Sequence, residues 1–416
     1  MQGVCYNENV IYFPFGVLSD MNNVTLPPLF NRTVAEIDLD AAEYNFNALK
    51  AMSNGKMTCA VIKANAYGHG ALRLARLYSE LGVDFFAVAG ISEAKELRYG
   101  GIKEPILVLG YIPPESATLA ADLDITVTVY SLDFAKQLSG ALKGSGKTLK
   151  FHLKFDTGMG RLGFIPAKTG ENALPDALDA INLPSLILDG AFTHFAVADG
   201  GDDAPSREFT QEQARRFSFA MDYLKSFGIV PRVKHVSNSA ATLDYPHLAI
   251  DMVRLGISLY GLCPSFDIKN PFSPKPVMTL KSVISHIKTI SRGDSVSYGR
   301  TFTAEKSTRV ATVPLGYADG FFRSSSQNGV TLTVGDKAVP ILGRVCMDQL
   351  MIDVTDTEAE LFCEVRAFGS GAFESADSYA DKNGTIGYEA TCAVGKRVPR
   401  VYIRHGAIDS FVDYLE

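Results

Sequence analysis

The sequence predicts an α/β fold class in which an N-terminal (β/α)8 TIM barrel is followed by a C-terminal, mostly β domain. Over residues 31–268, short apolar segments alternate with amphipathic segments, which is the pattern of a parallel βα repeat. Over residues 269–416, helical patterns nearly vanish, and segments of valine, isoleucine and threonine are separated by glycine turns. Residues 1–30 show no periodic pattern, so we treat them as an N-terminal extension with no assigned function.

The barrel segment contains about nine candidate strands, against the eight that a (β/α)8 barrel needs over about 250 residues. These candidates are 35–39, 58–63, 85–88, 106–109, 126–129, 149–154, 186–193, 233–236 and 252–255. Amphipathic helices are expected between them, for example at 71–82 and 92–99. Prolines at 271, 274 and 276 mark the change of pattern, so the domain boundary is placed close before them.

The composition indicates a globular protein that acts on small molecules. Hydrophobic residues make up 46% and charged residues 21% of the chain, and the net charge is −6. Because no basic run is present, we expect no binding to nucleic acid or to an anionic membrane. The six cysteines include no CxxC pair. Neither a metal site nor a disulfide framework is therefore expected.

The sequence predicts a cytoplasmic location. The apolar stretch at residues 10–18 is broken by proline and is not preceded by lysine or arginine, which argues against a secretory signal. No segment approaches the roughly 20 apolar residues that a membrane helix needs.

Lys63 lies at the C-terminal end of an early candidate strand, which is the end where barrels place their active sites. A lysine packed there against apolar neighbours would favour its neutral amine and could form a Schiff base with a carbonyl cofactor. An ordinary surface lysine just past a strand is the alternative. The small, glycine-rich segment 64–70 is unlike a plain helix start and favours the functional interpretation, with His69 expected to fix this loop.

Two later turns are candidates for binding a phosphate. Arg254 lies in the strand 252–255 and is followed by Gly256, where exposed backbone N–H groups can hold a phosphate. Asn238 and Ser239 follow the strand 233–236 and add a hydroxyl donor. Late barrel strands are the usual place for phosphate sites. Each turn is weak evidence by itself, because most such turns have only a structural role.

Three motifs of the C-terminal domain place polar and aromatic groups between candidate strands. They are residues 297–299, 316–320 and 344–348. Tyr298, in the first motif, could act as a proton donor. Structural tyrosines are far commoner than catalytic ones, so these residues alone leave Tyr298 unassigned.

Taken together, these motifs resemble the alanine racemase family of fold-type III pyridoxal-phosphate enzymes. The resemblance covers nearly all of the chain from Arg32 to Arg404. It depends on residues 60–70, 153–164, 193–196, 238–241, 254–257, 297–299, 316–320, 343–349 and 388–389. It implies that Lys63 carries pyridoxal 5'-phosphate and acts as the base on one face of the substrate, while Tyr298 of the partner subunit acts on the other.

The resemblance also implies the remaining cofactor contacts. The positions that match the family's cofactor-binding residues are Tyr67, His194, Asn238, Ser239, Arg254, Gly256, Ile257 and Tyr388. Arg254 matches the residue beside the pyridine nitrogen, and because arginine has only donors it should keep that nitrogen unprotonated. His194 matches a histidine that pairs with Arg254 or with the tyrosine base; a buried structural histidine is the alternative.

For the substrate, the resemblance implies a small pocket for alanine. Arg161 matches an arginine near the substrate carboxylate, and Met347 and Asp348 of the partner subunit match residues lining the carboxylate pocket. Tyr317 and Tyr388 match tyrosines that narrow the entrance of the pocket. Lys154 matches a lysine that is carbamylated in many relatives. An ordinary salt bridge from an unmodified Lys154 to an acid is an equal alternative.

The resulting hypothesis is a cytoplasmic homodimer with composite active sites that interconverts L-alanine and D-alanine for peptidoglycan. A racemase of serine or of a broader range of amino acids is the main alternative, because it would use the same residues in a roomier pocket. A noncatalytic pyridoxal-phosphate-binding protein is less favoured, since such proteins lack the β domain that supplies Tyr298 and Met347.

Overall fold

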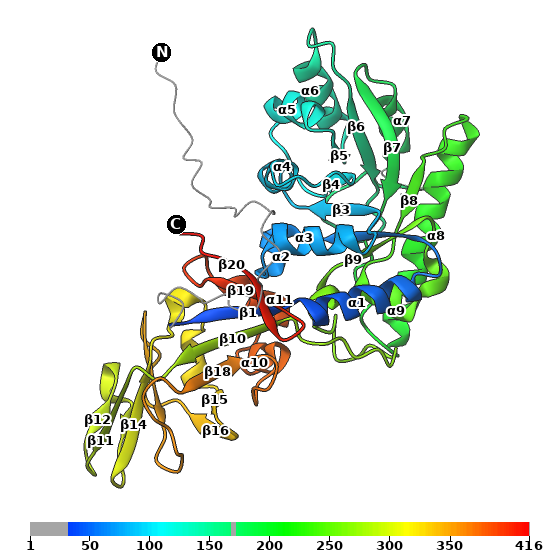
Figure 1. Ribbon diagram of the computed structural model, residues 1–416. Coiled ribbons are helices and arrows are strands. Elements are labelled where there is room, and N and C mark those ends of the chain that lie inside the picture. Colours follow the sequence, from blue (N-terminus) through cyan, green and yellow to red (C-terminus); the bar gives the residue numbers. More distant parts are fainter. Residues whose placement is uncertain (1–31, 168–171, 416) are drawn as a thin grey trace, which may run out of the picture. The chain divides into compact units, whose positions relative to one another are not determined.

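The computed structural model of the chain describes residues 32–167 and 172–415, and these form two compact units (Figure 1). One unit runs from Ala42 to Lys275, and the other joins the segment that ends at Ala41 to the chain from Pro276 onward. Residues 268 and 269, where the sequence places the boundary, lie in a stretch without helix or strand, as do residues 275 and 276. The N-terminal extension at residues 1–30 lies outside the described residues.

The first unit is a barrel of eight parallel strands in the order β8-β7-β6-β5-β4-β3-β2-β9. Its strands are β2 (Met57–Val61), β3 (Phe85–Val88), β4 (Ile106–Val108), β5 (Ile125–Val129), β6 (Leu149–Lys154), β7 (Leu186–Phe192), β8 (Val233–His235) and β9 (Met252–Leu255). The two end strands are joined by backbone hydrogen bonds from Asp251 to Lys234 and from Arg254 to Ser237, each 3.0 Å long. These bonds close the sheet into the barrel that the sequence predicts.

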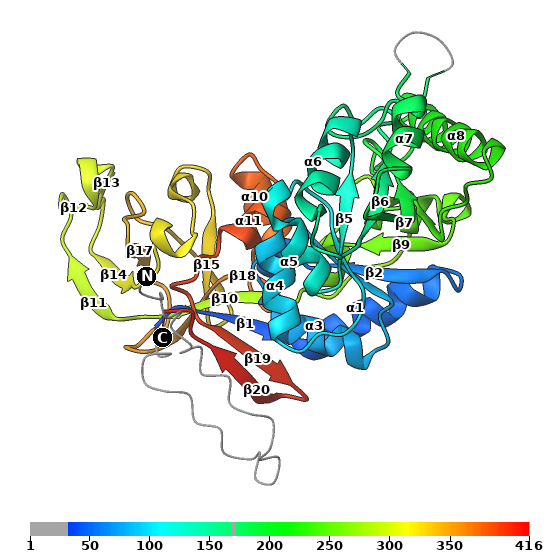
Figure 2. The same cartoon turned by 90° about the horizontal axis from the view of Figure 1, so that it is seen from above.

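Helices connect and surround these strands (Figures 1 and 2). They are α1 (Leu39–Met52), α2 (Lys63–Tyr67), α3 (Ala71–Glu80), α4 (Ile91–Tyr99), α5 (Ala117–Asp122), α6 (Leu132–Leu142), α7 (Leu174–Ile181), α8 (Ala204–Ser226) and α9 (Ser239–Asp244), with the 3-10 helices η2 (Pro114–Ser116), η3 (Pro246–Leu248) and η4 (Ile257–Tyr260). Strands β3, β4 and β5 are buried at every position. Burial on both faces explains why β3 and β4 are continuous apolar runs, whereas β5 alternates apolar residues with two buried threonines.

The candidate strand at 35–39 does not belong to the barrel, which corrects the sequence-based expectation. It forms β1 (Val34–Asp38), which pairs antiparallel with β10 (Met278–Val283) and parallel with β19 (Arg400–Arg404) of the second unit. Its residues alternate between half-buried and buried positions. That alternation is typical of a sheet with one partly solvated face, unlike the barrel strands β3, β4 and β5, which are buried at every position. Removing this candidate leaves the eight strands of the barrel.

The second unit is mostly β, as the sequence predicts. A seven-stranded sheet has the order β16-β15-β18-β10-β1-β19-β20, a three-stranded sheet has the order β11-β14-β17, and β12 pairs with β13. The further strands are β11 (His286–Ile290), β12 (Ser295–Val296), β13 (Phe302–Thr303), β14 (Thr308–Val313), β15 (Thr331–Val334), β16 (Lys337–Pro340), β17 (Leu350–Asp353), β18 (Glu364–Phe368) and β20 (Ala407–Val412). The helices are α10 (Ala376–Lys382) and α11 (Gly387–Ala393), with η5 (Tyr298–Arg300), η6 (Tyr317–Asp319) and η7 (Arg323–Ser326).

Candidate active site

Lys63 follows strand β2 and begins a backbone turn of unusual handedness. The four residues Ala64 to Tyr67 all have φ between 52° and 54°. This left-handed conformation costs about 1–2 kcal/mol for each non-glycine residue, so it needs compensation from its surroundings. The Lys63 Nζ atom lies 5.9 Å from the centre of the Tyr67 ring. The strained turn therefore places the amine and the phenol of one motif side by side.

Hydrogen bonds from His69 and to Glu93 hold this turn in place. The Nδ1 atom of His69 lies 3.0 Å from the carbonyl oxygen of Ala66 and 2.9 Å from that of Tyr67, so Nδ1 must carry the proton that it donates. The backbone N–H of Ala64 donates to the Glu93 carboxylate over 2.6 Å. His69 is fully buried. It fixes the loop, as the sequence analysis expects.

A small cradle lies beside this turn. A Cβ atom at Gly256 would lie 3.2 Å from the Tyr67 hydroxyl and 3.7 Å from the Ser239 hydroxyl, so the two hydroxyls and the glycine backbone converge. The Gly256 N–H donates to Ser239 Oγ over 2.8 Å. Asn238 caps helix α9 through its side-chain oxygen, and Ile257 is buried where η4 begins. Each of these five predicted residues therefore has a defined place at one end of the barrel.

Arg254 is buried in the barrel interior on strand β9. It donates hydrogen bonds to the carbonyl oxygens of Thr193, His235 and Val236. Its guanidinium also lies 2.8 Å from His235 Nδ1 and 3.2 Å from His194 Nδ1. Burial lowers the pKa of Arg254 to about 10, so the group remains charged at neutral pH. Arg254 is a fixed, buried cation whose donors are directed by its neighbours.

His194 is held as a neutral imidazole beside this cation. Burial, together with the charge of Arg254, lowers the pKa of His194 well below its usual value. Gln213, which is fully buried on α8, donates to the carbonyl oxygen of His194 over 3.0 Å and accepts from the N–H of Ala196 over 2.9 Å. These two hydrogen bonds of the Gln213 side chain attach the loop of His194 to helix α8.

Lys154, at the end of β6, is only 5% exposed. Burial and the nearby charge of Arg254 lower its pKa to about 7. Its amine donates to the carbonyl oxygen of Phe155 over 2.8 Å and forms no ion pair with any residue of the described ranges. Asp156 instead accepts hydrogen bonds from backbone N–H groups of its own loop. The salt bridge that the sequence allows as an alternative is therefore not formed.

Arg161 lies on the loop that follows β6. The ends of this loop are paired by backbone hydrogen bonds of 2.9 Å between Asp156 and Phe164 and between Phe164 and Lys154. Arg161 is exposed, and within residues 32–167 and 172–415 its guanidinium forms no hydrogen bond or ion pair. Its donors are thus available to a carboxylate.

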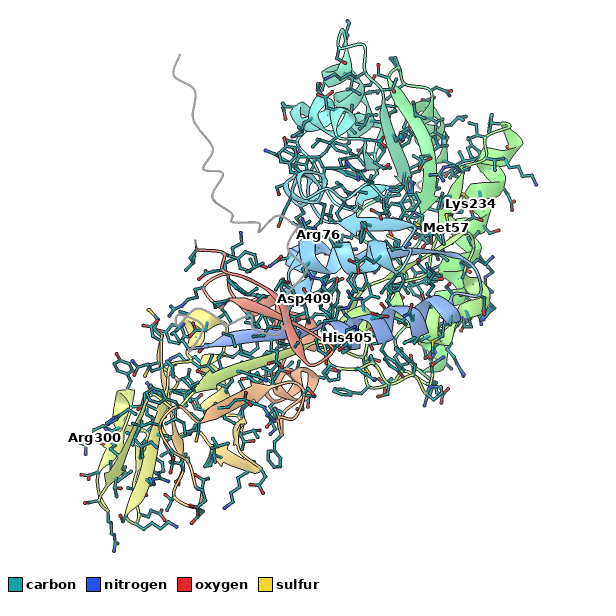
Figure 3. All side chains as sticks on the ribbon, in the orientation of Figure 1. Met57, Arg76, Lys234, Arg300, His405 and Asp409 are labelled. Carbon is teal, nitrogen blue, oxygen red and sulfur yellow. The ribbon has the colours of Figure 1, made fainter. Side chains whose placement is uncertain are left out.

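The motifs of the β domain meet within their own unit. The N–H of Tyr317 donates to the carbonyl oxygen of Cys346 over 3.1 Å, and the hydroxyl of Ser297 donates to that of Arg344 over 2.7 Å. These bonds bring together segments 297–299, 316–320 and 344–348, which are separate in the sequence. Figure 3 shows the neighbouring Arg300 at the edge of this unit.

Three predicted side chains of these motifs project into solvent. Tyr298 is 70% exposed, Met347 is 52% exposed and Tyr317 is 41% exposed. Asp348 is bound by Arg397 at 2.9 Å, and Arg397 also pairs with a buried aspartate of the 316–320 motif. Tyr388 is half-buried on α11 of the same unit. The ion pairs of Arg397 thus lie among the same motifs that expose Tyr298, Met347 and Tyr317.

Two family models match the chain. The alanine racemase N-terminal domain matches residues 37–264, and the alanine racemase C-terminal domain matches residues 277–402. The chain belongs to the alanine racemase family. This family of isomerases accounts for both units of the fold, since each family domain corresponds to one of them.

Individual members of the family align along their whole length. The alanine racemases of Clostridium tetani and Methanococcus maripaludis are each 42% identical to the chain, with 92% and 89% of this chain and 98% of each relative covered. The solved alanine racemase of Clostridium difficile 630 has a TM-score of 0.87 and 40% identity, with 95% and 100% coverage. That of Bacillus anthracis, solved with bound L-Ala-P, has a TM-score of 0.87 and 36% identity, with 94% and 99% coverage.

Sequence reasoning missed several polar residues of the barrel unit, of which His152, His235 and Gln213 are fully buried and Asp189 is half-buried. His235 contacts Arg254 directly, and His152 and Asp189 continue from it through the barrel. Gln213 was missed in the same way. A histidine or a carboxylate within a barrel strand is the signal that could have found His152, His235 and Asp189, because a buried polar group must have a partner.

Three further properties concern the described residues as a whole. Within residues 32–167 and 172–415, no group of three or more His, Cys, Asp and Glu side chains is arranged to hold a metal ion. The cysteines of these ranges form no disulfide. No helix in the same ranges is both long enough and apolar enough to cross a bilayer.

Proposed function

We propose that the chain interconverts L-alanine and D-alanine with pyridoxal 5'-phosphate, using Lys63 and Tyr298 of the partner subunit as bases on opposite faces of the substrate. The observation that carries this proposal is the cradle of Tyr67, Ser239 and Gly256 beside the strand-end amine. A phosphate needs converging donors with room for its oxygens, and a Schiff base needs a nearby lysine.

The residues present fit this cofactor. Tyr67, Ser239 and the backbone at Gly256 would hold its phosphate, since even one added carbon at the glycine would approach both hydroxyls. Lys63 would hold its carbonyl carbon, and Arg254 would donate to its ring nitrogen. When bound, the cofactor supplies a conjugated ring that stabilises negative charge at the substrate Cα.

The chain's own residues would then govern the proton transfers. Lys63 Nζ takes or returns the Cα proton on one face, and Tyr298 Oη does so on the other, which inverts the centre without turning the substrate over. Because the Arg254 guanidinium has only donors, it cannot accept a hydrogen bond from a protonated ring nitrogen and would hold that nitrogen unprotonated. A ring held in this way would accept negative charge less strongly, which would favour racemisation over transamination.

The exposure of Tyr298, Met347 and Tyr317 supports a homodimer with composite sites. Large apolar side chains gathered on an exposed surface mark an interaction site. In our proposal this surface of one subunit, with Asp348, completes the pocket built on Lys63 and Arg161 of the other, while Tyr388 would contact the phosphate of the cofactor. Arg161 has donors to spare for the substrate carboxylate, and the bulky tyrosines limit the side chain to that of alanine.

The first prediction concerns cofactor and substrate together. Purified protein should absorb near the visible edge, as expected for a lysine-bound cofactor, and should exchange the Cα proton of alanine in heavy water much faster than that of serine. Comparable racemisation of serine would favour the broad-specificity alternative. A bound cofactor without exchange would favour the noncatalytic alternative, and no bound cofactor would refute the assignment of Lys63.

The second prediction concerns Lys154, which we propose is carbamylated. The neutral amine adds to CO₂ and releases one proton, which leaves a carbamate anion able to orient Arg161. Since the pKa of Lys154 is about 7, the amine is mainly neutral above pH 7 and protonated below it. Charge-assisted hydrogen bonds contribute about 1.5–3 kcal/mol. Removing CO₂ at pH 8 should therefore raise the KM for alanine about tenfold or more.

Bicarbonate should restore this KM at pH 8, and its effect should fade as the pH falls through 7. Lys154→Ala should remove the response to bicarbonate. Lys150→Ala is the matched control, because Lys150 lies on the same strand but forms an exposed ion pair with Asp124. If the KM of the protein without substitutions did not depend on CO₂, the proposed carbamate on Lys154 would be refuted.

The wider role follows from the family. We propose that the product is D-alanine for peptidoglycan and that the reaction takes place in the cytoplasm. The relatives named as alanine racemases support the formation of D-alanine.

A further inference from the structure

A continuous line of hydrogen-bonded side chains crosses the interior of the barrel. Arg254 on β9 lies 2.8 Å from His235 Nδ1 on β8, and His235 Nε2 lies 2.8 Å from His152 Nδ1 on β6. His152 Nε2 lies 3.3 Å from the carboxylate of Asp189 on β7. Arg232, just before β8, donates to both oxygens of Asp189 over 2.7 and 2.8 Å. The line thus links four strands within one unit.

The chemistry of its two ends fixes every proton in the line. Arg254 has only donors, so His235 Nδ1 must accept, and the neutral ring then carries its proton on Nε2. That proton is donated to His152 Nδ1, so His152 must also carry its proton on Nε2. It donates this proton to Asp189, which as a carboxylate has only acceptors. The four groups therefore form a relay in which every bond runs in one direction, from Arg254 to Asp189.

The backbone is adapted to place Asp189 in this relay. Between β6 and β7 the register shifts: Phe151 pairs with Leu188, but the next residue, His152, pairs with Gly190. Asp189 is the extra residue of this bulge, and bulges commonly redirect a side chain next to a functional site. At Gly190 a Cβ atom would lie 2.6 Å from the His152 ring. The bulge and the glycine together make room for the histidine and its acceptor.

The surroundings keep both imidazoles neutral. His152 and His235 are fully buried. Burial lowers the pKa of each ring, and the charge of Arg254 lowers that of His235 further. Burial alone would raise the pKa of Asp189, but hydrogen bonds from His152 and Arg232 hold it below its usual range. The charge of Lys154 also lowers the pKa of His235. The ring of Phe192 stacks on the His235 ring, with 4.8 Å between the two ring centres.

We propose that Asp189 is a positioning residue for racemisation, acting through His152 and His235 to fix how Arg254 presents its donors to the cofactor ring. This inference rests on the proposed function. Losing the acceptor would free His152 to place its proton on Nδ1. His235 would then place its proton on Nδ1 as well, opposite the donor of Arg254. Arg254 would lose its alignment, although Asp189 is linked to it only through the two histidines.

Histidine tautomers provide a test that needs neither cofactor nor turnover. In cofactor-free protein with ¹⁵N-labelled histidine, ring nitrogen NMR spectra distinguish Nδ1–H, Nε2–H and charged rings. The chain has seven histidines, and His152→Gln and His235→Gln would assign the two signals. We expect both rings to be neutral with the proton on Nε2 throughout pH 7 to 9. A ring that titrates in this range, or that carries its proton on Nδ1, would overturn the relay.

Variants of Asp189 then link the tautomers to catalysis. In Asp189→Ala, and as a mixture in Asp189→Asn, we expect His152 and His235 to populate Nδ1–H. Loss of a residue that orients a metal ligand from the outer shell changes activity by about 10- to 100-fold, and we expect an effect of the same order here. We therefore expect kcat to fall at least tenfold in Asp189→Ala and the ratio of transamination to racemisation to rise.

Asp251→Asn is the matched control. Asp251 also pairs with a cation beside β8, at 2.8 Å from Lys234 (labelled in Figure 3), but lies outside the relay. It should change neither the tautomers nor the product ratio. If Asp189→Ala does not fold, the histidine tautomers and kcat of the protein without substitutions and of Asp189→Asn test the relay. A lower kcat with unchanged tautomers would overturn the relay in favour of a purely structural role, whereas correct tautomers in a protein that racemises nothing would refute only the proposed function.

Discussion

Lys63→Ala is expected to reduce alanine racemisation by more than about 10⁴-fold, because it removes both the attachment of the cofactor and one of the two bases. A positioned base alone contributes about 10²- to 10⁴-fold. The substitution should also abolish the absorbance of the lysine-bound cofactor. A chiral assay of D-alanine and an absorbance spectrum of the same sample measure the two effects together.

Lys56→Ala is the matched control, because Lys56 is an exposed lysine just before the same strand. It should keep both the activity and the absorbance. Thermal unfolding of both variants would show whether the barrel is intact. If Lys63→Ala kept racemisation within tenfold of the original activity, Lys63 could not be the cofactor lysine.

Sequence alone locates the barrel strands well, because each contains apolar residues and alternates with an amphipathic or turn segment. Strands β3, β6 and β9 have the bounds that the sequence predicts. The segment 35–39 was also recognised as a strand, but not its partners. Strand pairing in β1 depends on residues more than 200 positions away, and its alternating burial resembles that of the second domain rather than the barrel.

The candidate site shows the same division between local and distant information. The residues that follow strands β2, β8 and β9 could be identified because each lies in a short motif. The left-handed turn from Ala64 to Tyr67 could not be foreseen, since its non-glycine residues disfavour that conformation. His152 and His235 are separated by 83 residues, and only the barrel brings their rings together. Their role depends on the register of strands, which the sequence pattern does not specify.

Tyr298→Phe is expected to reduce racemisation by about 10²- to 10⁴-fold while leaving the fold and the cofactor absorbance unchanged, since only the proton-carrying hydroxyl is lost. Because Lys63 would still serve one face, Cα exchange in heavy water should survive for one enantiomer of alanine and disappear for the other. Tyr99→Phe is the control, because Tyr99 is also an exposed tyrosine, at 69%, but lies on α4 of the barrel unit. Equal loss of exchange for both enantiomers would contradict a two-base mechanism.

Mixing the two inactive variants tests whether the sites are shared between subunits. Random exchange of Lys63→Ala and Tyr298→Phe subunits makes half of the dimers mixed, and each mixed dimer has one site with both bases and one site with neither. A 1:1 mixture should therefore recover about a quarter of the original activity if the dimer is symmetric. If both bases came from the same subunit, no mixed dimer would contain an intact site, and the activity would stay at the level of the two variants. Mass labels on the subunits would verify exchange, so that an inactive but fully exchanged mixture would place both bases within one chain.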